Sequence, residues 1–223
     1  MRRTKEDAAR TRAAIMEAAL CCFDRHGISG STLDQIAGEA NVTKGAVYHH
    51  FGGKRQILHE LREAVSLPML DEADTALLHA RGLPALDRVE NFLLGILDAL
   101  ENDRRKRRTM AVMQFKCEYV DDLSEELAGL VKNHRRLAAA FEGAYGEARK
   151  AGALARHLTP GIAALETVMF LSGLVRLWLL HAGHHPLGKD ARAVIGAHVQ
   201  SRREPARASA RTARAKAARG LSG

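Results

Sequence analysis

The stretch NVTKGAVYHHF, residues 41–51, decides how the first part of this chain folds. On a helical wheel at about 100° per residue, its positions from 44 onward divide into two arcs. The inward arc, which can pack on the preceding segment, consists of Ala46, Val47, His50 and Phe51. The outward arc consists of Lys44, Gly45, Tyr48 and His49. It offers a cation, a bare backbone, a phenol and an imidazole without an acid, and this combination suits phosphates and base edges.

The residues before and after this stretch predict two short helices joined by a tight turn. Four apolar residues recur at helical spacing just before it: Leu33, Ile36, Ala37 and Ala40. Ser31 or Thr32 can cap that first helix, Asn41 tolerates the left-handed geometry of the turn, and Thr43 can cap the second helix. The pattern predicts a helix-turn-helix. Spacing alone leaves an ordinary helical hairpin with a solvated outer face as the alternative.

Hydrophobic periodicity predicts further helices and no strands, so the expected fold class is all-α. The first helix covers residues 9–26 and ends at Gly27, and a long helix runs from Lys54 towards residue 80 with a kink or break at Pro68. Four or five more helices follow, roughly at residues 84–101, 104–119, 122–150, 161–181 and 189–200.

Composition and charge exclude several classes of protein. The chain has 223 residues, 46% hydrophobic and 4% aromatic, which suits a globular helical protein. No 20-residue stretch lacks charge and no apolar segment follows the basic N-terminus, so we expect neither a membrane span nor a secretory signal. Three cysteines predict no disulfide framework, which favours a cytoplasmic location. Residues 201–223 carry a net +6 of the chain's +8, and their composition predicts a disordered basic tail.

Residues 32–58, TLDQIAGEANVTKGAVYHHFGGKRQIL, resemble the DNA-binding signature of the TetR family of bacterial transcriptional regulators. The shared pattern is a Thr, an Ile-Ala pair, a Val-Thr-x-Gly-x-x-Tyr-x-His-Phe run and a later Lys-x-x-Leu/Ile. The preceding segment, RTRAAIMEAALCCFDRHG, is similar as well. The resemblance implies a two-fold dimer on a palindromic operator. It also implies a DNA-binding domain at residues 1–56 and a ligand-binding and dimerisation domain at residues 57–200, ahead of the tail at 201–223.

The resemblance implies DNA contacts from Thr32, Thr43, Lys44, Gly45, Tyr48, His49, His50 and Lys54. Lys44 and Gly45 would lie against DNA, and Lys54 would reach the phosphate backbone. His50 matches a position that often touches phosphate, whereas the helical wheel places it beside the core. Many relatives have arginine at position 44, and lysine makes the forked contact to guanine less firmly.

Residues 108–127, RTMAVMQFKCEYVDDLSEEL, and 172–182, SGLVRLWLLHA, are similar to AcrR-like repressors of drug-efflux operons. This similarity and the helical pattern predict a pocket lined by Leu67, Phe92, Leu93, Ile96, Met110, Met113, Gln114, Cys117, Leu137, Phe141, Val168, Leu171 and Ser172. Core packing is the alternative for each aliphatic residue. Flexible methionines suit varied ligands, and Gln114 and Ser172 favour neutral or aromatic ones.

The resemblance also implies a dimer interface on the helix that contains residues 172–182. The expected interface residues are Leu174, Val175, Trp178 and Leu179. For Trp178, packing in the core of its own chain is the alternative.

The predicted function is therefore a ligand-responsive repressor of an efflux operon, and a regulator of a metabolic operon answering an acyl or aromatic intermediate is the alternative. We expect no enzyme activity, cofactor or metal, because neither Cys117 nor the group His181, His184 and His185 has suitable partners in sequence. The run DRRKRR at 103–108 is interpreted as a solvated loop and helix end, or otherwise as a second DNA contact. The basic tail either solubilises the chain or adds phosphate contacts, and a non-specific architectural protein would need those contacts to dominate.

Overall fold

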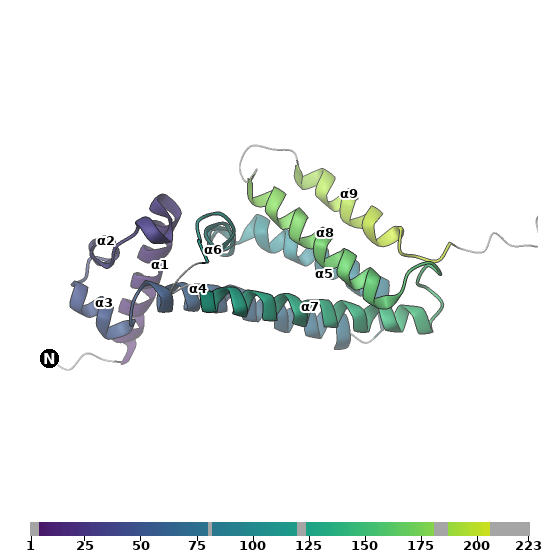
Figure 1. Ribbon diagram of the computed structural model, residues 1–223, viewed down its shortest axis with the longest axis horizontal. Helices are drawn as coiled ribbons and strands as arrows, with labels where there is room; N and C mark the ends of the chain where they lie inside the picture. The colour runs from purple at the N-terminus through teal and green to yellow at the C-terminus, as the bar shows by residue number, and fades with distance from the viewer. Residues whose placement is uncertain (1–4, 80–81, 120–123, 181–186, 206–223) are drawn as a thin grey trace, which may run out of the picture.

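The computed structural model describes residues 5–79, 82–119, 124–180 and 187–205, and this part of the chain is helical with no strand (Figure 1). The helices are α1 (Lys5–Gly30), α2 (Leu33–Glu39), α3 (Lys44–His50), α4 (Lys54–Ala73), the π-helical η1 (Asp74–His79), α5 (Ala85–Asn102), α6 (Arg104–Phe115), α7 (Ser124–Lys150), α8 (Pro160–Leu180) and α9 (Leu187–Gln200). Helices α1, α2 and α3 form one end of an elongated molecule, and α4 and α7 run along its length. The all-α prediction is confirmed.

A bend at Gly27 separates the regular part of α1 from α2. Its φ of 73° and ψ of 170° break helical geometry, and glycine adopts this left-handed φ without steric cost. The Ser31 hydroxyl donates to the Gly27 carbonyl at 2.7 Å. Thr32 then starts α2 with a capping box, in which its hydroxyl accepts from the Gln35 N–H at 3.1 Å. The predicted stop at Gly27 and the cap at Thr32 are confirmed.

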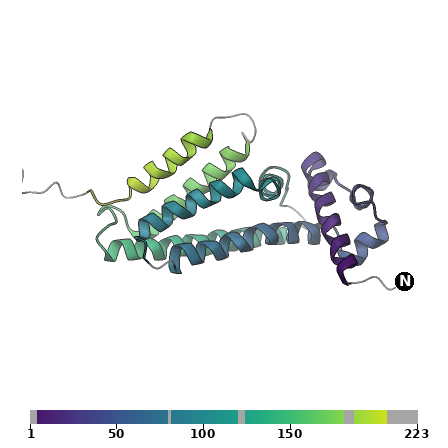
Figure 2. The same cartoon turned by 180° about the vertical axis from the view of Figure 1, so that it is seen from behind.

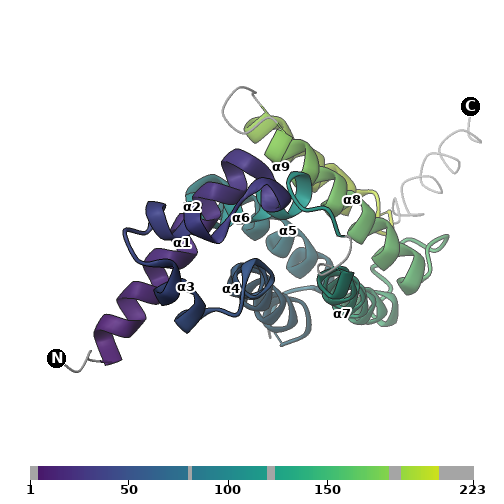
Figure 3. The same ribbon diagram turned by 60° about the vertical axis from the view of Figure 1, so that its left-hand side comes forward.

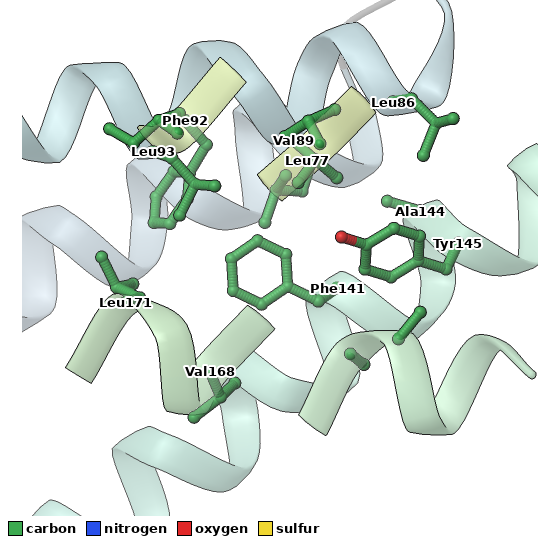
Figure 4. Close-up of a cluster of buried hydrophobic side chains, with 14 of the residues drawn as sticks. Leu77, Leu86, Val89, Phe92, Leu93, Phe141, Ala144, Tyr145, Val168 and Leu171 are labelled. Carbon is green, nitrogen blue, oxygen red and sulfur yellow. The ribbon is translucent and has the colours of Figure 1, made fainter. Parts of the chain in front are cut away.

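Two hydrophobic cores share α4. One core gathers the inner faces of α1, α2 and α3 on the first turns of α4, where Ile57 and Leu61 are buried. The other lies between α5, α7, α8 and α9 around the rings of Phe141 and Tyr145, and Met69 of α4 packs against it (Figure 4). The helix continues through Pro68, where we had expected a kink or break, because packing on both cores offsets the hydrogen bond that proline cannot donate.

Helix α6 ends four residues earlier than the sequence predicted, at Phe115. The carbonyl of the next residue, Lys116, accepts a hydrogen bond from the Ile28 N–H at 3.2 Å. The Tyr119 hydroxyl folds back and donates to the Met113 carbonyl at 3.0 Å. These bonds satisfy groups at the helix end, so the contact with the end of α1 replaces a further turn.

The basic run at 103–108 joins three helices, so its interpretation as a solvated loop and helix end is wrong for Arg107 and Arg108, whereas Arg104 and Arg105 are exposed. Asp103 caps α6 by accepting from the Lys106 N–H at 2.9 Å. Arg107 donates to two carbonyls at the end of α5, at 2.9 and 3.1 Å. Arg108 pairs with Asp24 of α1 at 3.3 Å. The cations therefore hold α6 against α5 and α1.

The expected tail does not begin at residue 201. Arg202 is only 6% exposed and pairs with Glu166 of α8 at 3.0 Å. Arg203 pairs with Asp87 of α5 at 2.6 Å. Composition could not reveal these contacts, because the partner acids lie far back in the sequence. Residues 206–223 lie outside the described part of the chain.

By length and composition, α8 could cross a membrane. Its inner face, however, belongs to the second core, with Ala163 and Leu171 buried. The helix packs against α7, and the reverse view shows α4 and α5 in front of these two helices (Figure 2). This packing is typical of a core helix in a globular domain.

A polar network joins α7, α8 and α9. The Thr167 hydroxyl donates to the Ala163 carbonyl at 2.8 Å, and it lies 2.7 Å from the Tyr145 hydroxyl and 3.0 Å from His198 Nε2. The His198 ring stacks on Phe170 with centroids 3.9 Å apart. Desolvation, helped by the charge of Arg202, lowers the pKa of His198 to about 4. The imidazole is therefore neutral in the folded protein at neutral pH.

We predict that acid destabilises the fold through His198. Its folded pKa of about 4 lies below the ordinary 6.5, so the unfolded chain binds more protons between these values and stability falls as the pH drops through this window. After a discount for partial exposure, we expect a loss of about 1–2 kcal/mol in the free energy of unfolding from pH 7 to pH 5. Urea unfolding of the wild type and His198→Gln at both pH values measures it. The variant should lose this increment, and equal pH dependence in both proteins would contradict the assignment.

Candidate DNA-binding face and effector cavity

A left-handed turn at Asn41 positions α3. Its φ is 53°, and the following Val42 N–H donates to the Ala37 carbonyl at 2.9 Å. Thr43 then caps α3 by accepting from the Ala46 N–H at 3.1 Å. Asparagine tolerates this backbone geometry better than most residues. Both predicted roles, Asn41 in the turn and Thr43 at the cap, are confirmed.

The two arcs predicted for α3 are confirmed by burial. Val47 and Phe51 are 0% and 1% exposed, and they pack into the core formed with α1 and α2. Exposed residues on the other arc are Lys44, Gly45, Tyr48 and His49. His50 is half-buried, as the wheel predicted, with its ring edge-on to that of His49 and centroids 5.3 Å apart. The helix-turn-helix thus presents a polar, mostly uncharged face with one lysine at its start.

Lys44 has an acidic partner that the sequence analysis missed. Its Nζ lies 2.8 Å from Asp34 Oδ2, in the first turn of α2, and both side chains are exposed. The hydrogen bond and the charge of Asp34 raise the pKa of Lys44, so its ammonium stays charged. Only the face of α3 itself was considered in the sequence analysis, and that face carries no acid. The bond to Asp34 uses one of the three donors of the ammonium, so Lys44 keeps two donors for a phosphate or base edge.

Lys54 directs its ammonium inward. It donates to the carbonyls of Ile28, Ser29 and Ser31 at 2.9, 3.4 and 2.7 Å. These three bonds use all the donors of an ammonium. The predicted phosphate contact from Lys54 is therefore replaced here by a clasp between the start of α4 and the loop that precedes α2. Thr32, another predicted DNA contact, is exposed at the start of α2.

A cavity of about 500 Å³ lies among α4, α5, α6, α7 and α8. The predicted ligand-binding residues that line it are Phe92, Ile96, Met110, Met113, Gln114, Leu137, Leu171 and Ser172. Leu93, Phe141 and Val168 do not line the cavity and belong to the second core (Figure 4). Cys117 packs against the first core, and the side chain of Leu67 lies outside the described part of the chain.

Leu67 was the one residue of α4 predicted to line the cavity, and the α4 residues that do line it were not predicted from the sequence, nor were most of the polar ones. Further lining residues are Val65, Ser66, Met69, Tyr119, Leu130, Asn133, His134, Gly173 and Arg176. Val65 and Met69 continue the apolar stripe of Leu58 and Leu61 at helical spacing, so periodicity could have predicted that they face inward. Burial raises the pKa of Tyr119 to about 12, so its hydroxyl stays protonated.

The four residues predicted for the dimer interface face the inside of the chain. Val175 and Leu179 are buried and line the cavity, and Leu174 and Trp178 pack partly buried against the second core. The structure thus favours the core alternative for Trp178. Large apolar side chains do lie exposed on the outer faces of α8 and α9: Ile162, Leu165, Met169, Leu177, Leu180 and Val194. We call this set the outer apolar face.

A buried ion pair joins α4 to α7 between the cavity and α3. Arg62 and Glu126 are 6% and 5% exposed. Arg62 Nη1 donates to the Glu126 carbonyl at 3.0 Å and lies 3.3 Å from its carboxylate. A Cβ added at Gly129 would overlap Nη1, so only glycine leaves room for the guanidinium on the α7 backbone. Ser66 and Leu130 of the cavity lie one turn further along α4 and α7.

Among the described residues, no group of three or more His, Cys, Asp or Glu side chains could hold a metal ion. His181, His184 and His185, which the sequence analysis weighed as a metal site and set aside, lie outside those residues. The basic segment 206–223, which could add phosphate contacts, also lies outside them.

Both parts of the chain, the one with the helix-turn-helix and the one with the cavity, match families of known proteins. Residues 15–61 match the family described as bacterial regulatory proteins, tetR family, and residues 84–202 match the MAATS-type transcriptional repressor, C-terminal region. The HTH-type transcriptional regulator TtgR of Pseudomonas putida is 34% identical over 190 residues, 81% of this chain and 85% of TtgR. The HTH-type transcriptional repressor BepR of Brucella suis is 31% identical over 206 residues, 92% of this chain and 98% of BepR.

Solved structures agree with these matches. NalD, the secondary repressor of the MexAB-OprM multidrug efflux pump in Pseudomonas aeruginosa, has a TM-score of 0.79 at 26% identity, over 91% of this chain and 100% of NalD. A SmeT–triclosan complex has a TM-score of 0.75 at 25% identity, over 88% and 93% of the two chains. These relatives are transcriptional regulators and not enzymes. With a helix-turn-helix at one end and a family match over both halves, this chain belongs to the tetR family of bacterial regulatory proteins.

Proposed function

We propose that this protein represses an efflux operon as a dimer, and that a hydrophobic or aromatic small molecule entering the cavity releases it from a palindromic operator. One observation carries the proposal: α4 packs in the same core as α3 at one end and lines the cavity at the other. In this proposal residues 1–56 bind DNA and residues 57–200 bind effector and partner. The description of NalD as an efflux-pump repressor supports the choice of operon. A cytoplasmic location follows from binding to chromosomal DNA.

The outward arc of α3 is the proposed reading face. Gly45 lets the backbone approach DNA closely, while Tyr48 and His49 offer a hydroxyl and an imidazole to phosphates and base edges. Lys44, whose side chain is exposed, offers DNA the ammonium donors that Asp34 does not use. Dimerisation through the outer apolar face places two such helices at about one turn of DNA, 34–36 Å, apart. Burying large apolar side chains from water supplies the driving force for that association.

The effector acts by changing how the protein molecules divide between two conformations, one that binds the operator and one that does not. A ligand that binds better to a cavity widened between α4 and α7 favours the state in which α4 has moved. The first turns of α4 share a core with α3, so α3 moves with them. Arg62 and Glu126, one turn from the cavity, resist that movement in the absence of ligand.

We predict that Lys44→Ala weakens operator binding by about 1–3 kcal/mol if Lys44 contacts a base, and weakens all DNA equally if it contacts phosphate only. Fluorescence anisotropy on the DNA upstream of the gene, against scrambled DNA and at several salt concentrations, measures both affinities. Lys150→Ala, at the far end of α7, is the matched control and should bind like the wild type. Equal wild-type affinity for the two DNAs would refute a sequence-specific repressor.

A second prediction concerns Gly129. In Gly129→Ala the new Cβ displaces the Arg62 guanidinium, so we expect a loss of about 1–3 kcal/mol in stability and altered operator affinity. Gly146→Ala is the control on the same helix, because a Cβ there meets nothing within 4 Å. Replacing this helical glycine should leave stability unchanged or raise it by about 0.5–1 kcal/mol. Urea unfolding and DNA anisotropy test both. If the two variants behave alike, Gly129 has no special role.

A further inference from the structure

The polar groups that line the cavity are neutral or cationic, and none is an acid. The polar lining residues are Ser66, Gln114, Tyr119, Asn133, His134, Ser172 and Arg176, and no Asp or Glu is found among the described lining residues. Three of these groups are already bonded within the chain. Ser172 donates to the Val168 carbonyl at 2.8 Å, Tyr119 to the Met113 carbonyl at 3.0 Å, and His134 Nδ1 lies 2.9 Å from the Leu130 carbonyl.

Two lining groups lack a partner: one is a hydrogen-bond donor without an acceptor, and the other is a cation without a carboxylate. Asn133 Nδ2, on α7, is buried and finds no hydrogen-bond acceptor in the described structure. Arg176, on α8, lies over the ring of Phe115 with its Cζ 5.1 Å from the centroid, and no carboxylate of the described chain pairs with it. A buried donor without a partner destabilises the protein, because it has lost its hydrogen bonds to water. A ligand acceptor that bonds to this donor removes that penalty. A guanidinium held by an aromatic ring attracts anions, with which it forms short, strong hydrogen bonds.

We propose that the effector is an amphipathic organic anion, with an aromatic body and a single carboxylate or phenolate. The body fills the apolar walls formed by Phe92, Ile96 and Leu137. The anionic oxygen accepts a hydrogen bond from Asn133 and pairs with Arg176. A cation of the same shape meets Arg176 with no acid in the lining to balance it, and it leaves the Nδ2 donor of Asn133 unpaired. This inference rests on the proposed function, because it names the effector class of the same cavity.

The test compares three ligands that share a biphenyl body: biphenyl-4-carboxylate, biphenyl-4-carboxamide and the biphenyl-4-ylmethylammonium ion. Calorimetry on the full chain gives the three affinities, and the fluorescence of Trp178, the single tryptophan, gives an independent readout beside the cavity. We expect the carboxylate to bind most tightly and the ammonium to bind at least about tenfold more weakly, since charge-assisted hydrogen bonds are about twice as strong as neutral ones. Equal or tighter binding of the ammonium overturns the proposal. This comparison uses the wild type, so it does not depend on the folding of any variant.

Two variants test whether Asn133 and Arg176 cause the preference for the carboxylate over the ammonium. Asn133→Asp keeps the shape of the side chain and replaces a donor with an acid, so the preference should shift towards the ammonium. Arg176→Gln should lower carboxylate affinity by about tenfold and leave carboxamide affinity nearly unchanged. Arg135→Gln, an exposed arginine on α7 outside the lining, is the matched control and should keep the wild-type order. An unchanged order in both cavity variants would overturn the assignment of these residues.

Operator release, measured separately by anisotropy, distinguishes the two proposals. Tight carboxylate binding that leaves the protein on DNA refutes the proposed function and supports the ligand class. Release by the ammonium at the same concentration as by the carboxylate refutes the ligand class and supports the proposed function.

Discussion

The contact between Arg62 and the backbone of α7 is the constraint on which the rest of the structure depends. It places a buried cation between two long helices, and it is possible only because residue 129 has no side chain. Burying a cation is unfavourable unless its donors are satisfied, and here a carbonyl and two carboxylates satisfy most of them. Helices α4 and α7 contact each other, and Figure 3 shows them to the right of α1, α2 and α3. This contact therefore holds the distance between α4 and α7 within a narrow range.

The helix-turn-helix is attached to this pair of helices at several points. Lys54 holds the loop before α2 against the start of α4, and Ile57 and Leu61 place α4 in the same core as α3. On the other side, the Ile28 N–H to Lys116 carbonyl bond and the Arg108 ion pairs hold α1 against α6. Both α4 and α6 line the cavity. In the proposed mechanism, a change in cavity shape therefore reaches α3 through packed, hydrogen-bonded elements and not through a flexible linker.

The sequence could predict the structural features that depend only on residues close together in the chain. Asn41 in its turn, Thr43 at its cap and the two arcs of α3 follow from local geometry, and the structure has each as predicted. The errors share a cause, since each depends on a partner distant in sequence. Examples are the inward ammonium of Lys54 and the early end of α6. Likewise, the resemblance assigned Val175 to a dimer interface because of the helix on which it lies, and a resemblance of that kind does not say which of two apolar faces meets the core.

The central claim is that α4 transmits the shape of the cavity to α3. The most direct measurement is the distance between spin labels on the two subunits of the proposed dimer. The labels are carried by a noncanonical residue at Gly38, where an added Cβ meets nothing within 4 Å. Pulsed electron paramagnetic resonance would record the distance distribution with operator DNA, without DNA, and with saturating effector. The account predicts that effector moves the distribution away from the DNA-bound distance. An unchanged distribution, under conditions in which the effector does release the operator, would contradict it.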